Sequence, residues 1–106
     1  MKKQVFVTFE YEGWHSWPNA PQAQEYLRNS HRHLFNFKIW YLVNHNDREI
    51  EFIAKKMEMM GFVAQHFNKY DFGSCESVAE AILNSDPIIT RVVVSEDGEN
   101  GADLER

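Results

Sequence analysis

The segment from Ser30 to Asn44 alternates between two kinds of residue, and this alternation constrains the fold more than any other feature of the chain. In an extended backbone, successive side chains point to opposite faces, so every second residue shares a face. One face is then almost wholly apolar and carries Phe35, Phe37, Ile39, Tyr41 and Val43. Such a segment predicts a strand whose apolar face belongs to the core.

Two histidines stand at the start of this segment. His31 and His33 are two residues apart, so in a strand both imidazoles project from the same face. A third histidine, His15, closes the strand-like run that precedes them. Three neutral imidazoles can hold Zn²⁺ at roughly 2.0–2.1 Å and leave a fourth position open. We therefore expect a zinc site, the alternative being three ordinary surface or hydrogen-bonded histidines.

Composition limits the partners of the chain. Its 106 residues predict one domain, residues 1–106, with a modest core. Aromatic residues make up 14% of the chain, more than so small a core needs, so we expect some of them to be buried against other copies. The chain has sixteen Asp and Glu residues against eleven Lys and Arg residues, and the Lys and Arg residues form no cluster in the sequence. Nucleic acid is therefore not expected as a partner.

The expected cellular compartment rests on the cysteine content and on the absence of targeting or membrane segments in the sequence. The single cysteine, Cys75, excludes a disulfide within the chain. There is no signal peptide and no apolar run of about 18 residues, the length that a membrane helix needs. We expect a soluble, cytoplasmic protein without membrane association.

Alternation and β-branched residues predict strands at 4–11, 34–44 and 88–95. A turn with Gly98 and Gly101 follows, and then a fourth strand at 102–106, which is expected to be short and frayed. The third strand delivers Glu96 at its C-terminal end. Between the first two strands, the stretch 12–29 has no sustained period and one helical turn near 22–27. A connection of this length often carries function.

Two helices are expected between the second and third strands. Helical spacing begins at Ile50, and Gly61 suits a left-handed end of the first helix, followed by an aperiodic stretch at 62–72. Ser74 predicts the N-cap of the second helix, where Glu76 complements the helix dipole. The result is an α+β fold, an antiparallel sheet covered on one face by two helices. Its open edges favour assembly of several copies into a ring.

These features, in this order, resemble the family of 6-pyruvoyl-tetrahydropterin synthase and 6-carboxytetrahydropterin synthase. The first mark is His15 followed by the His-x-His of His31 and His33. The second is Glu51-Phe52 and Gly73-Ser74-Cys75-Glu76, in place of the family's Asp-Phe and Pro-Thr-Ser-Glu. The third is Glu96 at the end of a strand, before a turn of small residues. The resemblance covers about residues 5–102.

The resemblance implies a tunnelling fold, in which subunits join their sheets into an oligomeric barrel of three, four or six copies. It implies Zn²⁺ on the three histidines and a pterin anchored by Glu96, with Glu76 and Cys75 near the ligand. The anchoring role also follows from chemistry. A guanine-like ring edge offers an N–H and an NH₂ side by side, and a carboxylate can accept both in parallel.

Several positions depart from the family pattern. The family's proton-transferring Cys is replaced by Leu27, and its Asp-His pair by Gln65-His66. His66 keeps an imidazole but loses the carboxylate that would orient it. Glu25 and Cys75 are the candidate substitutes, although neither stands at the expected position. The middle residue of the His-x-His is Arg32, where the family usually has Gly.

These matches and departures favour a zinc-containing protein that binds a pterin-like or guanine-like small molecule or nucleotide at subunit interfaces, with impaired catalysis. The alternative is an active lyase of this family acting on a dihydropterin triphosphate. In that enzyme His66 and a substitute acid would transfer protons while Zn²⁺ polarises side-chain oxygens. A third alternative is a structural oligomer with a vacant metal site.

Overall fold

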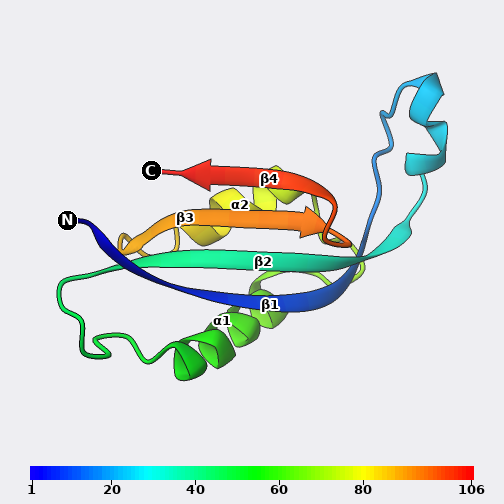
Figure 1. The fold of residues 1–106 in the computed structure, drawn as a ribbon. Coiled ribbons are helices and arrows are strands. Elements are labelled where there is room, and N and C mark those ends of the chain that lie inside the picture. The colour runs from blue at the N-terminus through cyan, green and yellow to red at the C-terminus, as the bar shows by residue number, and fades with distance from the viewer.

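The computed structural model describes all 106 residues of the chain. Four strands, two α-helices and one 3₁₀ helix follow one another in the chain (Figure 1). In order they are β1 (Lys3–His15), η1 (Gln22–Leu27), β2 (His31–Val43), α1 (Phe52–His66), α2 (Cys75–Leu83), β3 (Ile89–Glu96) and β4 (Asn100–Glu105). Neither α-helix is long and apolar enough to cross a lipid bilayer.

The strands form one antiparallel sheet in the order β1-β2-β3-β4, so the fold is α+β. The expected alternation in β2 is confirmed, because all five residues of its apolar face are buried. Four of them, Phe35, Phe37, Ile39 and Tyr41, join one core cluster with inward residues of β1 and β3 and with residues of both helices, Met59 and Val63 from α1 and Val78, Ala79, Ile82 and Leu83 from α2. Both helices therefore pack against the same face of the sheet.

β1 is longer than its alternation predicts. It pairs with β2 along its whole length, from Lys3 opposite Val43 to His15 opposite His31. Residues 12–15 are therefore strand rather than connection, and β2 begins at His31 instead of near Leu34. The segment after α1 bonds to residues 12–15 on the edge of β1 that does not pair with β2. Trp14 N–H donates to Lys69 O at 2.7 Å, and Phe72 N–H donates to Trp14 O at 2.7 Å.

The expected end of the first helix at Gly61 is wrong, because α1 continues to His66. Gly61 is exposed within the helix, while Met59 and Val63 on either side of it are buried. Their burial against the sheet outweighs the weak helix propensity of one glycine. The helix begins where the Glu51 carboxylate accepts hydrogen bonds from the N–H groups of Ile53 and Ala54.

The start of α2 and the third strand agree with expectation, but β4 differs. The Ser74 hydroxyl accepts a hydrogen bond from Ser77 N–H at 3.1 Å and caps α2. Gly101 lies inside β4 rather than in the turn, opposite Ser95 of β3. β4 pairs with β3 from Asn100 to Glu105 and is not frayed.

A tight turn joins β3 to β4. Its central residues, Asp97 and Gly98, have positive φ angles of 56° and 73°, and Glu99 N–H donates to Glu96 O at 3.0 Å. This is the pattern of a type I′ turn, which favours an Asp-Gly pair and matches the twist of the strands it joins. The turn places Glu96 and Asp97 at the same end of the sheet as the paired histidines.

Candidate metal centre and adjoining cleft

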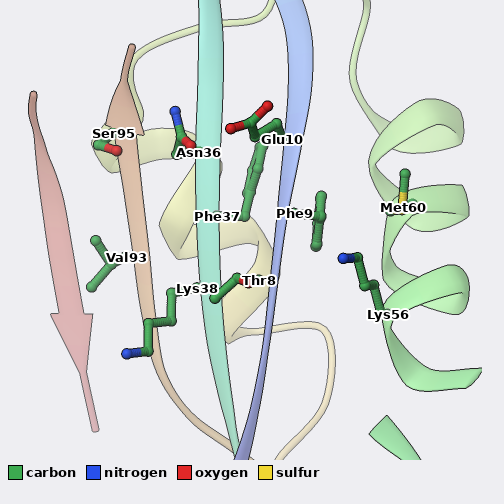
Figure 2. A pocket seen from close by; sticks show the side chains of 10 residues that line it. All are labelled: Thr8, Phe9, Glu10, Asn36, Phe37, Lys38, Lys56, Met60, Val93 and Ser95. Atoms are coloured by element: carbon green, nitrogen blue, oxygen red, sulfur yellow. The ribbon is translucent and has the colours of Figure 1, made fainter. Parts of the chain in front are cut away.

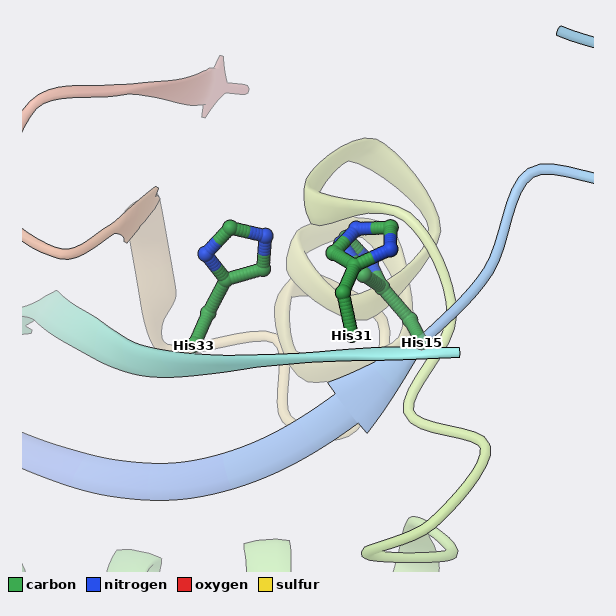
Figure 3. Close-up of side chains that lie close together, drawn as sticks. All are labelled: His15, His31 and His33. Carbon is green, nitrogen blue, oxygen red and sulfur yellow. The ribbon is translucent and has the colours of Figure 1, made fainter. Parts of the chain in front are cut away.

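Three histidines converge where β1 ends and β2 begins (Figure 3). His15 stands directly opposite His31 in the antiparallel pair, and His33 follows two residues later on the same face. One potential ligand atom from each of the three imidazoles lies within 4.8 Å of the others. The register of the hairpin therefore brings together residues that are 16 to 18 positions apart in the sequence. A single metal ion could contact all three.

The hydrogen bonds of the three rings fix which nitrogen faces the centre of the cluster. Each Nδ1 atom lies close to an oxygen that can only accept: Gly73 O at 2.7 Å from His15, Asn29 O at 2.8 Å from His31, and Asp97 Oδ2 at 2.7 Å from His33. Each Nδ1 therefore carries the proton, and in a neutral ring Nε2 keeps its lone pair. This is the tautomer in which histidine binds a metal through Nε2.

The carboxylate of Glu96 lies against two of these rings. Its Oε1 is 3.3 Å from Nε2 of His15, and its Oε2 is 3.4 Å from Nε2 of His33. The Nε2 atom of His33 is buried and has no hydrogen-bond partner. A lone pair and a carboxylate repel each other, so this arrangement is favourable when a positive charge lies between them, either a proton on the ring or a bound cation. The donor types fit Zn²⁺.

A cleft of about 510 Å³ opens beside the cluster. Its lining includes His15, Leu27, His31, Cys75, Glu76 and Glu96. The volume lies within the range of roughly 300–1,000 Å³ that small-molecule sites occupy. The cleft therefore joins two of the histidines to the three residues, Glu96, Glu76 and Cys75, that the sequence predicts to lie near a ligand. Leu27 contributes an apolar side chain where the family resemblance would place a thiol.

Cys75 is buried at the first position of α2 and is not a ready nucleophile. Its Sγ lies 4.0 Å from Glu96 Oε1, to which the thiol donates a weak hydrogen bond. Burial, followed by the negative charges of Glu96 and Glu76, raises the pKa of Cys75 to about 12. The thiol is therefore neutral at pH 7 and cannot act there as a thiolate base or nucleophile.

This raised pKa predicts that Cys75 resists alkylation. At pH 8 the folded protein should react with iodoacetamide on the order of 1,000-fold more slowly than the protein unfolded in urea, since the reaction needs the thiolate. Because the folded state holds this proton more tightly, the free energy of unfolding should fall as pH rises above about 9. Mass spectrometry of timed aliquots would measure the rate, and similar rates in both states would contradict the prediction.

Two of the three candidate proton-transfer residues, His66 and Glu25, lie outside the cleft of their own chain. His66 is exposed at the end of α1, where its Nδ1 donates to Phe62 O at 3.0 Å and its ring stacks on the Phe62 ring. Glu25 is exposed on η1. Neither belongs to the cleft lining that contains Glu96. One chain therefore does not bring them together with the histidine cluster.

Asp97 is a part of this site that the sequence reasoning did not single out. It accepts hydrogen bonds from Leu34 N–H at 2.8 Å and from His33 Nδ1 at 2.7 Å. The Leu34 N–H bond, followed by the bond from His33, lowers the pKa of the Asp97 carboxyl below its usual value. The available signal was the Asp-Gly pair directly after Glu96, which marks a tight turn and hence the return of the chain toward β2.

A second hollow, also of about 510 Å³, lies beside β1 and shares no lining residue with the cleft (Figure 2). Its walls come from β1, β2 and β3 and from Lys56 and Met60 of α1. Glu10 is its one carboxylate, and no imidazole or thiol lines it. The one cluster of side chains able to hold a metal ion therefore lies outside this hollow, at the three histidines.

The histidine cluster, the carboxylate of Glu96 and the cleft are all formed by residues of one chain. The chain matches no protein-family model and no curated protein sequence.

Proposed function

We propose that this protein binds Zn²⁺ through His15, His31 and His33 and holds a pterin-like or guanine-like small molecule in the adjoining cleft. It would act as a binding or sequestering protein with impaired catalysis, of the tunnelling fold that the sequence resembles. One observation carries the proposal. All three Nδ1 atoms are engaged by acceptor oxygens, which leaves the three Nε2 atoms as metal ligands, and those of His15 and His33 lie beside the Glu96 carboxylate.

The choice of metal rests on the donor set. Three imidazoles and an open position suit Zn²⁺ better than Mg²⁺ or Ca²⁺, which prefer oxygen ligands. The buried Nε2 of His33, which has no partner within the chain, would gain one. When bound, Zn²⁺ supplies Lewis-acid polarisation of an oxygen on the ligand. The chain's own contribution would be to orient the ring and to exclude water from the cleft.

The ligand class rests on Glu96 and on the walls of the cleft. Glu96 is partly exposed and lies at the cleft, so its two oxygens can accept from adjacent N–H groups of a flat ring. Trp17 also lines the cleft and is 48% exposed, which leaves an aromatic face for such a ring to stack on. A purine or pterin offers both the paired donors and the flat face.

Binding is favoured over turnover by the two cleft residues from which a thiol base was considered, Leu27 and Cys75. Leu27 carries no titratable group, and the Cys75 thiol stays protonated because its pKa is raised. One observation favours the alternative, an active lyase acting on a dihydropterin triphosphate. His66 keeps an exposed imidazole at the end of α1, where a neighbouring subunit can contact it.

Self-association is part of the proposal, because β1 and β4 are the edge strands of the sheet and the chain itself pairs the outer side of β1 only at Trp14. Large apolar side chains are exposed on and beside β1, namely Phe6 (49%), Phe52 (55%), Ile53 (69%) and Met57 (65%). Phe6, Phe52 and Ile53 line one groove between β1 and the start of α1. Covering this groove with another copy would remove apolar surface from water and pair a free strand edge.

Native mass spectrometry of protein purified from its host tests these points together, since one spectrum reports subunit number, metal and carried ligand. Titration calorimetry with GTP and with neopterin should then show saturable binding that is lost in Glu96→Ala. Glu99→Ala, in the neighbouring turn, is the matched control and should bind normally. Absence of binding to every purine, pterin and nucleotide tried would contradict the proposal. Consumption of dihydroneopterin triphosphate by the zinc-loaded protein would instead establish the lyase.

A further inference from the structure

The Asp97 carboxylate stands between two hydrogen-bond donors. Leu34 N–H points at Oδ1 from 2.8 Å, and Nδ1 of His33 lies 2.7 Å from Oδ2. The backbone of Asp97 is fixed to the same residue of β2, because Asp97 N–H donates to Leu34 O at 2.7 Å. The position of this carboxylate is therefore set by three hydrogen bonds and by the turn between β3 and β4.

The left-handed turn lets two consecutive acidic residues reach the same imidazole. In a regular strand, neighbouring side chains point to opposite faces. Asp97 has left the strand with φ of 56°, and its side chain returns to β2. As a result, Glu96 Oε2 lies 3.4 Å from Nε2 of His33, while Asp97 Oδ2 bonds Nδ1 of the same ring.

We propose that Asp97 is a positioning residue that fixes the tautomer and the orientation of His33 for metal binding, an inference that rests on the metal site proposed above. Bound through Nδ1–H, the ring presents the lone pair of Nε2 to the centre of the cluster. The negative charge of Asp97 also strengthens the donation of the Nε2 lone pair to a bound metal. His15 and His31 have neutral carbonyl partners, so His33 is the ring on which this charge acts.

Among side chains of this size, Asp alone accepts from both donors at once. Asn offers one acceptor oxygen and one NH₂ group, so it satisfies Leu34 N–H or His33 Nδ1–H but not both. With the oxygen on Leu34, the amide favours a His33 ring protonated on Nε2, which cannot bind the metal there. Asn adopts positive φ as readily as Asp, so Asp97→Asn leaves the turn intact and changes the hydrogen bonding alone.

Asp97→Asn should lower the affinity for Zn²⁺ by about 10–100-fold, the usual effect of removing an outer partner of a metal-bound histidine. Competition with a chromophoric chelator measures the affinity. Long-range ¹H–¹⁵N NMR of the metal-free protein reads the tautomer of each ring, and the proton of His33 should move from Nδ1 toward Nε2 in the variant. Asp97→Gly, which suits the positive φ and carries no side chain, should weaken binding without forcing that tautomer.

Asp103→Asn is the matched control, because Asp103 lies in the same hairpin but bonds Arg91 at 2.7 and 2.9 Å instead of a histidine. It should leave the zinc affinity and the tautomers unchanged. Equal zinc affinity in wild type and Asp97→Asn, with an unchanged His33 tautomer, would overturn the role of Asp97. A wild-type protein that binds no Zn²⁺ would overturn the metal site itself, which is a different result from the same titration.

Discussion

His33→Ala is expected to lower the affinity for Zn²⁺ by more than the roughly 10–100-fold that the loss of an outer partner costs, because it removes a direct ligand. The two remaining imidazoles would have to be supplemented by water or by Glu96. Glu96 would also lose one of the two rings that face its oxygens. Equilibrium competition with a chromophoric chelator, run beside Asp97→Asn, should rank the ligand variant well below the positioning variant.

The chain provides two internal controls for this experiment. His45 lies in the connection after β2, with Nε2 3.5 Å from Glu49, and His66 lies at the end of α1. Neither belongs to the cluster, so His45→Ala and His66→Ala should bind Zn²⁺ as the wild type does. If all three alanine variants lost affinity equally, or if His33→Ala lost none, zinc would be bound elsewhere or non-specifically.

Gly101→Ala is expected to have the largest effect on stability, a loss of about 3 kcal/mol or more in the free energy of unfolding. An added Cβ at Gly101 would lie 2.1 Å from Val94 O and 2.5 Å from Ser95 Cα. Both atoms are backbone of β3, so no side chain can move aside, and the pairing of β3 with β4 must open. Urea denaturation followed by circular dichroism would measure the loss.

Gly61→Ala is the matched comparison, because no atom outside the local helix backbone lies within 4 Å of a Cβ at Gly61. This glycine occupies an exposed position inside α1, where alanine should raise the free energy of unfolding by about 0.5–1 kcal/mol. The same chemical change should thus act in opposite directions at two sites. Similar effects at both positions would show that β3 and β4 do not approach each other as closely as described.

Local signals predicted much of the fold. The alternation in β2, the cap at Ser74 and the apolar stripe of α2 each depend on residues close together in the sequence, and the structure has all three. The errors came from contacts between distant segments. α1 continues past Gly61 because Met59 and Val63 pack on the sheet, and β1 continues to His15 because the chain after α1 pairs with Trp14.

In the candidate site, too, the sequence predicted the residues that local spacing brings together, but not those that distant segments supply. His31 and His33 share a face because a strand has a period of two, and His15 lies opposite His31 through the hairpin register. Two of their three outer partners could not be read from spacing, the exception being Asn29 O beside His31. The oxygens of Gly73 and Asp97 come from a loop and a turn that lie 58 and 64 residues from the histidines they contact. Only the folded arrangement brings them to the rings.

The segment 16–30 leaves the sheet at His15, returns at His31 and projects from the end of the molecule (Figure 1). A metal ion bound by both His15 and His31 would cross-link the two ends of this segment. Since Trp17 and Leu27 of this segment line the cleft, a metal ion that joins the two ends of the segment would also restrict the movement of the cleft wall.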